Sequence, residues 1–199
     1  MQAHPITLPA FGAAIPGQGG IFAAIMRGPV VDGIEQPPYA LLVSDATVGE
    51  IAEVEWGNYG KDVPGTSSRT DGLANTIAMA AANCPAALRV QAITIDGHSD
   101  YYLPALGELN SAAANVPELF STDDYYWTST QYSRYYAFVQ DFEYGDSAFL
   151  SKDNEHRARA FRRVQLTAQP NHIVDTTKVA RPVNCGTGYC SCIECVVKP

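Results

Sequence analysis

The first third of the chain contains two apolar runs that are typical of β-strands. They cover Ile21–Met26 and Tyr39–Val43, and the segment between them is rich in glycine and proline. Strands bounded by such turn residues pair as hairpins, so we predict a β-hairpin with a long loop. Residues 1–20 have no periodicity and are rich in Pro, Gly and Ala. They predict an extended N-terminal arm that becomes ordered by lying on another surface, such as a neighbouring subunit.

Two segments of the middle third carry helix signals. In the first, Asp71 can cap the helix start, helix-forming residues continue to Ala82, and Pro85 is a stop signal. In the second, Pro104 suits the first helical turn. The apolar residues that recur on one face of this second segment are Leu106, Leu109 and Ala113. We therefore predict two helices in total.

From Tyr126 onward, apolar and polar residues alternate with the two-residue period of a β-strand. A turn at 144–146 separates two of these segments, and the last third is therefore predicted to form an antiparallel sheet. The same alternation places Phe138 and Phe142 on one face of a strand. We expect Phe138 to belong to the core.

Length and charge narrow the class of protein. A chain of 199 residues fits one domain, which the pattern predicts to be an α+β domain over residues 21–166, with a polar, cysteine-containing tail at 167–199. The net charge of -8 and the pI near 4.8 argue against a nucleic-acid partner, because such binding needs a basic surface. The chain start lacks the features of a signal peptide, and no stretch reaches the ~18 apolar residues of a membrane span. We expect a soluble protein without membrane insertion.

The five cysteines are unevenly placed. Cys84 stands alone after an alanine-rich segment, and we expect it to be a small buried hydrophobic residue. The other four lie in the tail, at Cys185, Cys190, Cys192 and Cys195. Four thiolates can bind zinc or form two disulfides, but this spacing matches no standard zinc module. A loose or oxidised tail is therefore favoured over a metal site, and we predict no cofactor.

One short segment offers catalytic residue types. His98 lies among Asp96, Ser99 and Asp100. A hydrolase needs its nucleophile, base and acid to converge in space, whereas close sequence neighbours usually point in different directions. An Asp-Gly turn with a capping hydroxyl is the favoured interpretation of this segment.

Four arginines form a ladder near the end of the predicted domain. Arg157 and Arg159 alternate with alanines and so share one face of a strand, and Arg162 and Arg163 follow. Guanidinium groups in such a row can bridge the carbonyls and carboxylates of facing loops. We favour a structural clamp over a ligand-binding role, because an acidic chain supplies many internal partners.

A cluster of tyrosines suggests a different activity. Six of the eleven tyrosines lie within residues 125–149, interleaved with Ser, Asp and Arg. A binding surface needs this mixture, because tyrosine gives a large contact area for little lost side-chain entropy while small polar residues adapt to the ligand. The composition of this region therefore favours a binding surface over a catalytic centre.

Four motifs in series resemble a known family. They are "WGNYG" from Trp56, "DGLANTIAM" from Asp71, "IDGHSDYYLPALGELN" from Ile95 and "YYWTSTQYS…YAFVQDF…KDNEHRARAFRRV" from Tyr125. The chain resembles bacterial and phage C-type-lectin-fold domains of unknown function. These are similar to sulfatase-modifying-factor-type domains and to the variable, major tropism determinant-like proteins of diversity-generating retroelements. The resemblance covers roughly residues 56–166 and implies a C-type lectin fold, with two helices packed on a twisted antiparallel sheet.

In the retroelement-diversified members, the last sheet and its loops carry residues that arise from adenine mutation of the codon AAC. The resemblance therefore implies a ligand-binding surface on that sheet. The ligand-binding residues that it implies are Tyr132, Ser133, Arg134, Tyr135, Tyr144, Asp146, Ser147, Phe149, Ser151 and Asp153. The formylglycine-generating enzymes of the same fold use a cysteine pair in the lectin core, whereas the predicted domain has Cys84 alone.

The resemblance and the tyrosine cluster together predict a ligand- or receptor-binding protein of a phage or prophage, and not an enzyme. The partner would be a protein or glycan on a host cell surface, and the N-terminal arm would assemble a homo-oligomer. We expect such a chain in the virion, as part of a phage tail, or in the host cytoplasm before assembly. The alternatives are a structural virion protein with a lectin-fold module and a relative of the formylglycine-generating enzymes.

Overall fold

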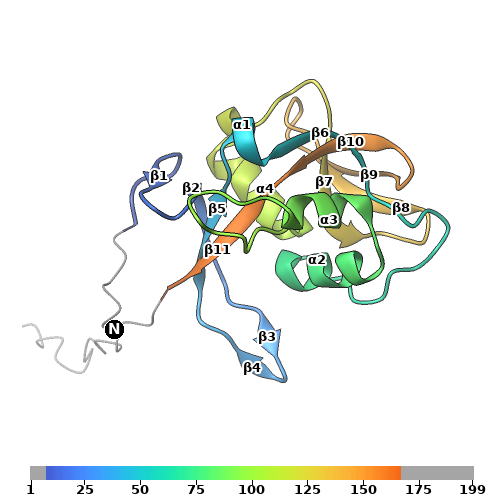
Figure 1. Ribbon diagram of the computed structural model, residues 1–199, viewed down its shortest axis with the longest axis horizontal. Coiled ribbons are helices and arrows are strands. Elements are labelled where there is room, and N and C mark those ends of the chain that lie inside the picture. Colours follow the sequence, from blue (N-terminus) through green and yellow to red (C-terminus); the bar gives the residue numbers. More distant parts are fainter. Residues whose placement is uncertain (1–7, 167–199) are drawn as a thin grey trace, which may run out of the picture. The chain divides into compact units, whose positions relative to one another are not determined.

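The computed structural model describes residues 8–166, which lie in one compact unit (Figure 1). This part of the chain has a mixed α+β architecture, with more strand than helix and with curled sheets in which antiparallel pairing dominates. The four tail cysteines considered above as metal ligands, Cys185, Cys190, Cys192 and Cys195, lie outside the described residues.

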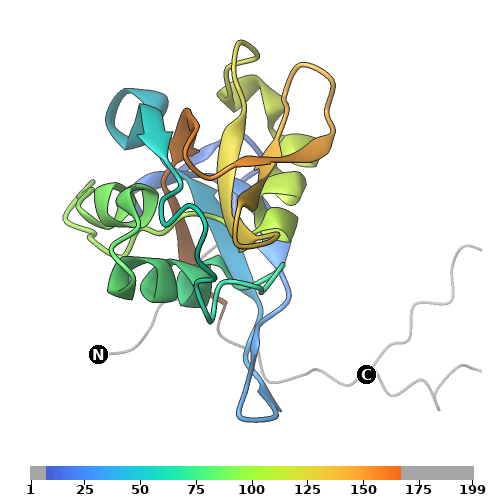
Figure 2. The same cartoon turned by 90° about the vertical axis from the view of Figure 1, so that its right-hand side faces the viewer.

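Three sheets make up the β structure. The first is four-stranded, in the order β1 (Ala14–Ile15), β2 (Gly20–Met26), β5 (Tyr39–Val43) and β11 (Phe161–Gln165). The second is five-stranded, in the order β6 (Glu50–Glu55), β10 (Glu155–Arg159), β7 (Tyr126–Gln131), β8 (Tyr136–Gln140) and β9 (Ser147–Ser151). The third is a small ribbon of β3 (Val30–Val31) and β4 (Ile34–Glu35). Figure 2 shows this ribbon protruding from the rest of the fold.

The helices outnumber the two that we predicted. They are α1 (Ala46–Gly49), α2 (Gly72–Ala81), α3 (Pro85–Gln91) and α4 (Leu106–Asn115), followed by the 3-10 turn η1 (Pro117–Leu119). The cap of α2 is confirmed, because the Asp71 carboxylate accepts a hydrogen bond from Ala74 N–H. Pro85, however, begins α3 and does not simply end α2. Asn83, between the two helices, has a positive φ of 58°, and Pro85 occupies the first position of α3, where its missing N–H costs no bond.

The predicted first hairpin is confirmed. β2 and β5 pair antiparallel from Ile21 opposite Val43 to Met26 opposite Tyr39, and the long loop between them contains the β3–β4 ribbon. Part of the expected N-terminal arm lies on this hairpin, since Gly12 N–H donates to Phe22 O at 2.9 Å. The role of the arm in contacting a neighbouring subunit remains a prediction.

The last third of the chain forms strands as predicted, but they do not make one antiparallel sheet. β7, β8 and β9 are consecutive antiparallel neighbours. β10 is inserted between β6 and β7, and its pairing with β7, at Arg157 opposite Tyr126, is parallel. β11 leaves this sheet and pairs with β5. The two larger sheets are therefore connected by the short link at Ala160, between β10 and β11.

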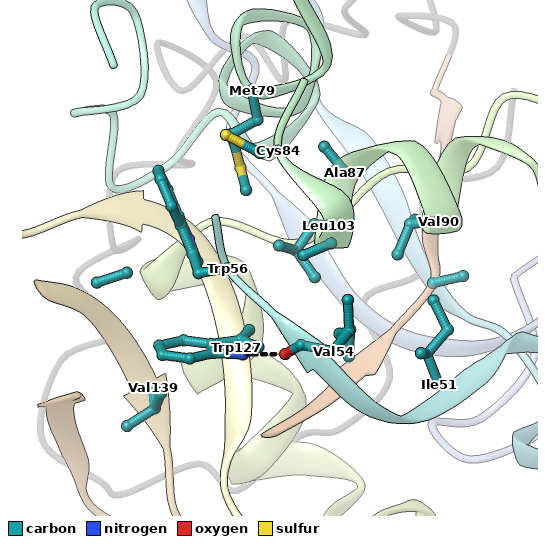
Figure 3. Close-up of a cluster of buried hydrophobic side chains, with 14 of the residues drawn as sticks. Ile51, Val54, Trp56, Met79, Cys84, Ala87, Val90, Leu103, Trp127 and Val139 are labelled. Carbon is teal, nitrogen blue, oxygen red and sulfur yellow. Dashed lines mark hydrogen bonds between the residues drawn. The ribbon is translucent and has the colours of Figure 1, made fainter. Parts of the chain in front are cut away.

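Two tryptophans anchor the core on the inner side of the five-stranded sheet. Trp127 Nε1 donates to Val54 O at 2.9 Å, and Trp56 Nε1 donates to Thr128 O at 2.8 Å. Both indoles are fully buried, so these bonds satisfy their only donors. Figure 3 shows the two rings within an apolar cluster that also contains Met79 and Cys84. Cys84 is thus a small buried residue, as expected.

The first pair of the arginine ladder joins the strands to their neighbouring loops. Arg157 and Arg159 share the Glu50 carboxylate, which confirms that they lie on one face of the strand. Arg159 is almost completely buried and also donates to Ser44 O and Leu119 O. These contacts are those of a structural clamp, the role that we favoured over ligand binding.

The second pair of the ladder lies on β11. Arg162 pairs with Asp100 at 2.5 Å and donates to Gln18 O. Arg163 pairs with Asp71 and Glu108, and its guanidinium also lies over the rings of two tyrosines, Tyr39 and Tyr102. Both arginines therefore hold segments from distant parts of the sequence, as the clamp interpretation requires.

Candidate ligand-binding surface

Strand alternation divides the side chains of β8 and β9 between two faces. Ala137 and Val139 of β8 are buried in the core, and Ala148 and Leu150 of β9 pack against the same core. The opposite face carries Tyr136 and Phe138 from β8, and Ser147, Phe149 and Ser151 from β9, because Phe138 pairs with Phe149 and Tyr136 with Ser151. Tyr132, from the β7–β8 connection, joins them. We call Tyr132, Tyr136, Phe138 and Phe149 the aromatic face.

The rings of the aromatic face contact one another. Tyr132 stacks on Phe149 with centroids 4.2 Å apart and an interplanar angle of 10°. Tyr132 also meets Phe138 edge-on at 5.3 Å, and Tyr136 meets Phe149 edge-on at 5.7 Å. Such packing holds the rings in place while leaving much of their surface in water: Tyr132 is 51% exposed and Phe149 is 46% exposed. Preorganised aromatic rings of this kind lose little further side-chain entropy on binding.

The loop before α2 borders the aromatic face. Arg69 lies over the Phe138 ring at 5.0 Å, a cation–π contact that covers part of that ring. Tyr59 packs against Tyr135 with centroids 5.3 Å apart, and both tyrosines are exposed. Arg134 pairs with Asp62 at 3.4 Å through exposed side chains. The exposed aromatic surface thus continues from the sheet onto a neighbouring loop.

The structure brings together only some of the ligand-binding residues that were predicted from the sequence. Tyr132 and Phe149 stack directly, and Ser147 and Ser151 lie on the same side of β9. Ser133 has a local structural role, since its Oγ accepts from the N–H groups of Tyr135 and Tyr136.

Other predicted residues lie apart from the aromatic face. Tyr144 and Asp146 belong to the turn after β8, whereas Tyr132 and Tyr135 precede that strand, and a five-residue strand spans about 15 Å. Tyr144 is 76% exposed and lines a shallow hollow with Asp141 and Glu143. Asp153 bonds to Ser151 Oγ. The predicted residues therefore fall into two groups at opposite ends of the β8–β9 hairpin.

Three aromatic residues of this surface were missed by the sequence reasoning. Phe138 is half-buried, and our assignment of it to the core is wrong, because it points to the face opposite Ala137 and Val139 and contacts Tyr132. Tyr136 shares that face by the same alternation, which was the signal that could have identified it. Tyr59 had no such signal, since it reaches Tyr135 only through the fold.

Two of the residues considered for catalysis, His98 and Asp100, have structural partners. Asp96 and Gly97 have positive φ values of 52° and 79°, which confirms an Asp-Gly turn. His98 Nε2 lies 2.9 Å from Gly17 O, and Asp100 pairs with Arg162. Burial raises the pKa of the Cys84 thiol, which disfavours the reactive thiolate.

No protein-family model matches the chain, and no curated protein matches it. Among the residues that the structure describes, no group of three or more His, Cys, Asp or Glu side chains is arranged to bind a metal ion. Within the same residues, every helix is too short or too polar to cross a membrane.

Proposed function

We propose that this protein is a ligand- or receptor-binding protein whose contact surface is the aromatic face and its borders. The observation that carries the proposal is the set of packed yet exposed rings on one side of β8 and β9. Large exposed apolar groups on a soluble domain mark interaction sites, since exposure without a partner favours aggregation. Aromatic side chains are also enriched among the residues that dominate binding energy.

The family context is part of the same proposal. The motifs that resemble the variable proteins of diversity-generating retroelements lie in the described domain, and the α+β architecture with curled antiparallel sheets is compatible with a C-type lectin fold. In this account β8, β9 and their turns carry diversified positions. The protein belongs to a phage tail or prophage, and the partner is a protein or glycan of a host surface. A homo-oligomer, assembled through the N-terminal arm, would strengthen weak individual sites by avidity.

One alternative uses the same surface differently. In a structural virion protein, the aromatic face would be buried against another subunit. The enzymatic alternative has less support, because Cys84 is buried, its pKa is raised and it bonds to Asn58 within the core. We therefore propose no catalytic role for the described domain.

Binding to intact cells tests the proposal. A fluorescent form of the chain is titrated against a panel of bacterial strains, alongside the double variant Tyr132→Ala/Phe149→Ala. Loss of two central aromatic contacts should lower the affinity for a bound strain by about 30-fold or more. The melting temperature should change by only a few degrees, because both rings are at the surface.

The matched control is the double variant Val48→Ala/Ile77→Ala. These residues lie on α1 and α2 and are 55% and 56% exposed, close to the exposure of Tyr132. The control should bind as the parent protein does. Equal binding by the parent and the Tyr132→Ala/Phe149→Ala variant would contradict the proposal. Loss of self-association in that variant, without any cell binding by the parent, would favour the structural virion protein.

A further inference from the structure

The outer strand of the five-stranded sheet has an edge beside the aromatic face that no strand of residues 8–166 occupies. In that part of the chain β9 pairs with β8 alone, over five consecutive residue pairs without a register shift. The bonds Lys152 N–H to Tyr135 O and Asp141 N–H to Asp146 O flank this ladder and fix its phase. Because bonded and non-bonded pairs alternate in an antiparallel ladder, Leu150 and Ala148 bond to β8. The peptide groups of Ser147, Phe149 and Ser151 therefore point to the free edge.

Most of the backbone N–H and carbonyl groups at the free edge of β9 are available for a further hydrogen bond. Within residues 8–166, the Ser151 carbonyl accepts from Asn154 N–H, while the three N–H groups of Ser147, Phe149 and Ser151 have no hydrogen-bond partner. The carbonyls of Ser147 and Phe149 are equally without a partner in that part of the chain. Edge donors and acceptors of this kind can pair with an added strand.

β9 lacks the features that usually protect a sheet edge. Its sequence, Ser-Ala-Phe-Leu-Ser, contains no proline and no charge. The opposite edge of the same sheet, β6, carries Glu50, Glu53 and Glu55, and its pairing with β10 is interrupted by a register shift. The β6 edge is therefore protected by its charges and by its irregular register, whereas the β9 edge is regular and uncharged.

The geometry points to β-strand addition: we propose that β9 receives an extended peptide segment of the ligand protein as a sixth strand. This inference rests on the proposed function and specifies its partner. Alternate side chains of the added strand lie beside Phe149 and Tyr132, so apolar or aromatic residues fit there. Backbone bonds to the edge supply affinity that does not depend on sequence, and the aromatic face supplies selectivity.

The charges at the ends of β9 favour a strand from another protein over a strand from a second copy of this chain. Asp146 and Asp153 are exposed at the two ends of β9. Antiparallel self-pairing centred on Phe149 would place Asp146 of one copy opposite the buried Lys152 of the other, one residue from the exposed Asp153, at both ends. Each chain also carries a net charge of -8, and this excess of like charge opposes self-association. A peptide with Lys or Arg at its ends and apolar residues between them is complementary.

Selection from a displayed library of random peptides about nine residues long tests the inference, since this length covers a strand. The wild-type chain is the bait, and enriched peptides should alternate apolar residues and carry basic ends. Their affinity is then compared for Ser147→Pro and its matched control Ser147→Ala. Both variants remove the hydroxyl that contacts Gln140 and Asn110, but only proline removes the N–H that points to the edge. Proline is tolerated on edge strands where its missing N–H faces solvent.

Ser147→Pro should bind the enriched peptides about tenfold or more weakly than Ser147→Ala, because the two variants differ in the N–H group while both lack the hydroxyl. If the proline variant unfolds, enriched peptides methylated at alternate backbone nitrogens replace it and should lose affinity to the same extent. Failure to enrich any peptide, or equal binding of both variants or of the methylated peptides, overturns strand addition. Cell binding that still depends on Tyr132 and Phe149 would then leave the proposed function standing.

Discussion

Lys152 carries its ammonium group into the interior of the domain. Its side chain is fully buried and lies 4.4 Å from the Trp56 ring centroid, and its Nζ donates to Gln131 Oε1 at 2.6 Å and to Lys61 O at 3.1 Å. Burial lowers the pKa of Lys152 to about 8, since two neutral acceptors replace only part of the lost hydration. An unfolded lysine has a pKa of about 10.4.

This difference predicts a pH-dependent stability. Between pH 8 and 10 the unfolded chain binds more protons at this site than the folded one, so the contribution of Lys152 to the free energy of unfolding rises with pH. Urea unfolding of the wild type and Lys152→Met should show a stability difference that shifts in favour of the wild type across this range. Val48→Ala, at an exposed residue that carries no charge, is the control and should show no such trend. A difference that is constant from pH 7 to 10 would mean that Lys152 titrates normally.

Prediction from the sequence succeeded at residues whose role depends only on the local backbone, such as helix caps and turns. Asp71 caps a helix and Asp96-Gly97 forms a turn, and both follow from local backbone chemistry. Phe138 failed, because alternation gives two faces without saying which one meets the core. Trp127 and Val139 are buried on the inner side of the sheet, so Phe138 lies on the outer side. Which side faces the core depends on the packing of the whole sheet and not on the sequence of one strand.

At the scale of elements, one buried carboxylate joins the starts of two helices to a strand. Glu108, in the first turn of α4, accepts from Gly72 N–H at the start of α2 and from Ala105 N–H before α4. It also accepts from the hydroxyls of Tyr39 and Tyr102. Complete burial raises the pKa of Glu108, although these donors and Arg163 favour its charged form.

Glu108→Gln should lower the free energy of unfolding by about 2–4 kcal/mol. The amide keeps the shape, but its NH₂ group would face a backbone N–H or a tyrosine hydroxyl, and Arg163 would lose part of its charge pairing. Chemical denaturation measures the loss. Glu118→Gln, at an exposed glutamate of η1, is the control and should stay within about 0.5 kcal/mol. A loss equal to that of the control would show that Glu108 does not hold these elements together.

Element prediction was limited by ambiguous signals. The same Pro85 that stops a helix can begin the next one, and only the positive φ of Asn83 shows that α3 follows at once. The strands of the last third were identifiable, because their alternation is strong. Their partners were not, since the insertion of β10 beside β7 and the transfer of β11 to the first sheet depend on non-local pairing.

At the scale of the whole molecule, the contacts that hold the domain together are separate from its exposed aromatic surface. The arginine clamp, the Glu108 contacts and the tryptophan core hold the sheets from within, while the aromatic face and the β9 edge lie outside. Surface substitutions away from structural contacts usually change stability little. Outward residues of β8 and β9 can therefore vary while the scaffold stays constant, which is what a diversified binding surface requires.

Sequencing the gene in many related isolates, together with its downstream DNA, would show whether the outward positions are diversified. We predict substitutions at outward positions, above all Tyr132, Phe149 and Ser151, at codons that adenine mutation can produce. The inward neighbours Ala148 and Leu150 should stay constant, and a near-identical template should lie beside a reverse transcriptase gene. Variation spread evenly over inward and outward positions, without a template, would contradict a diversified binding surface.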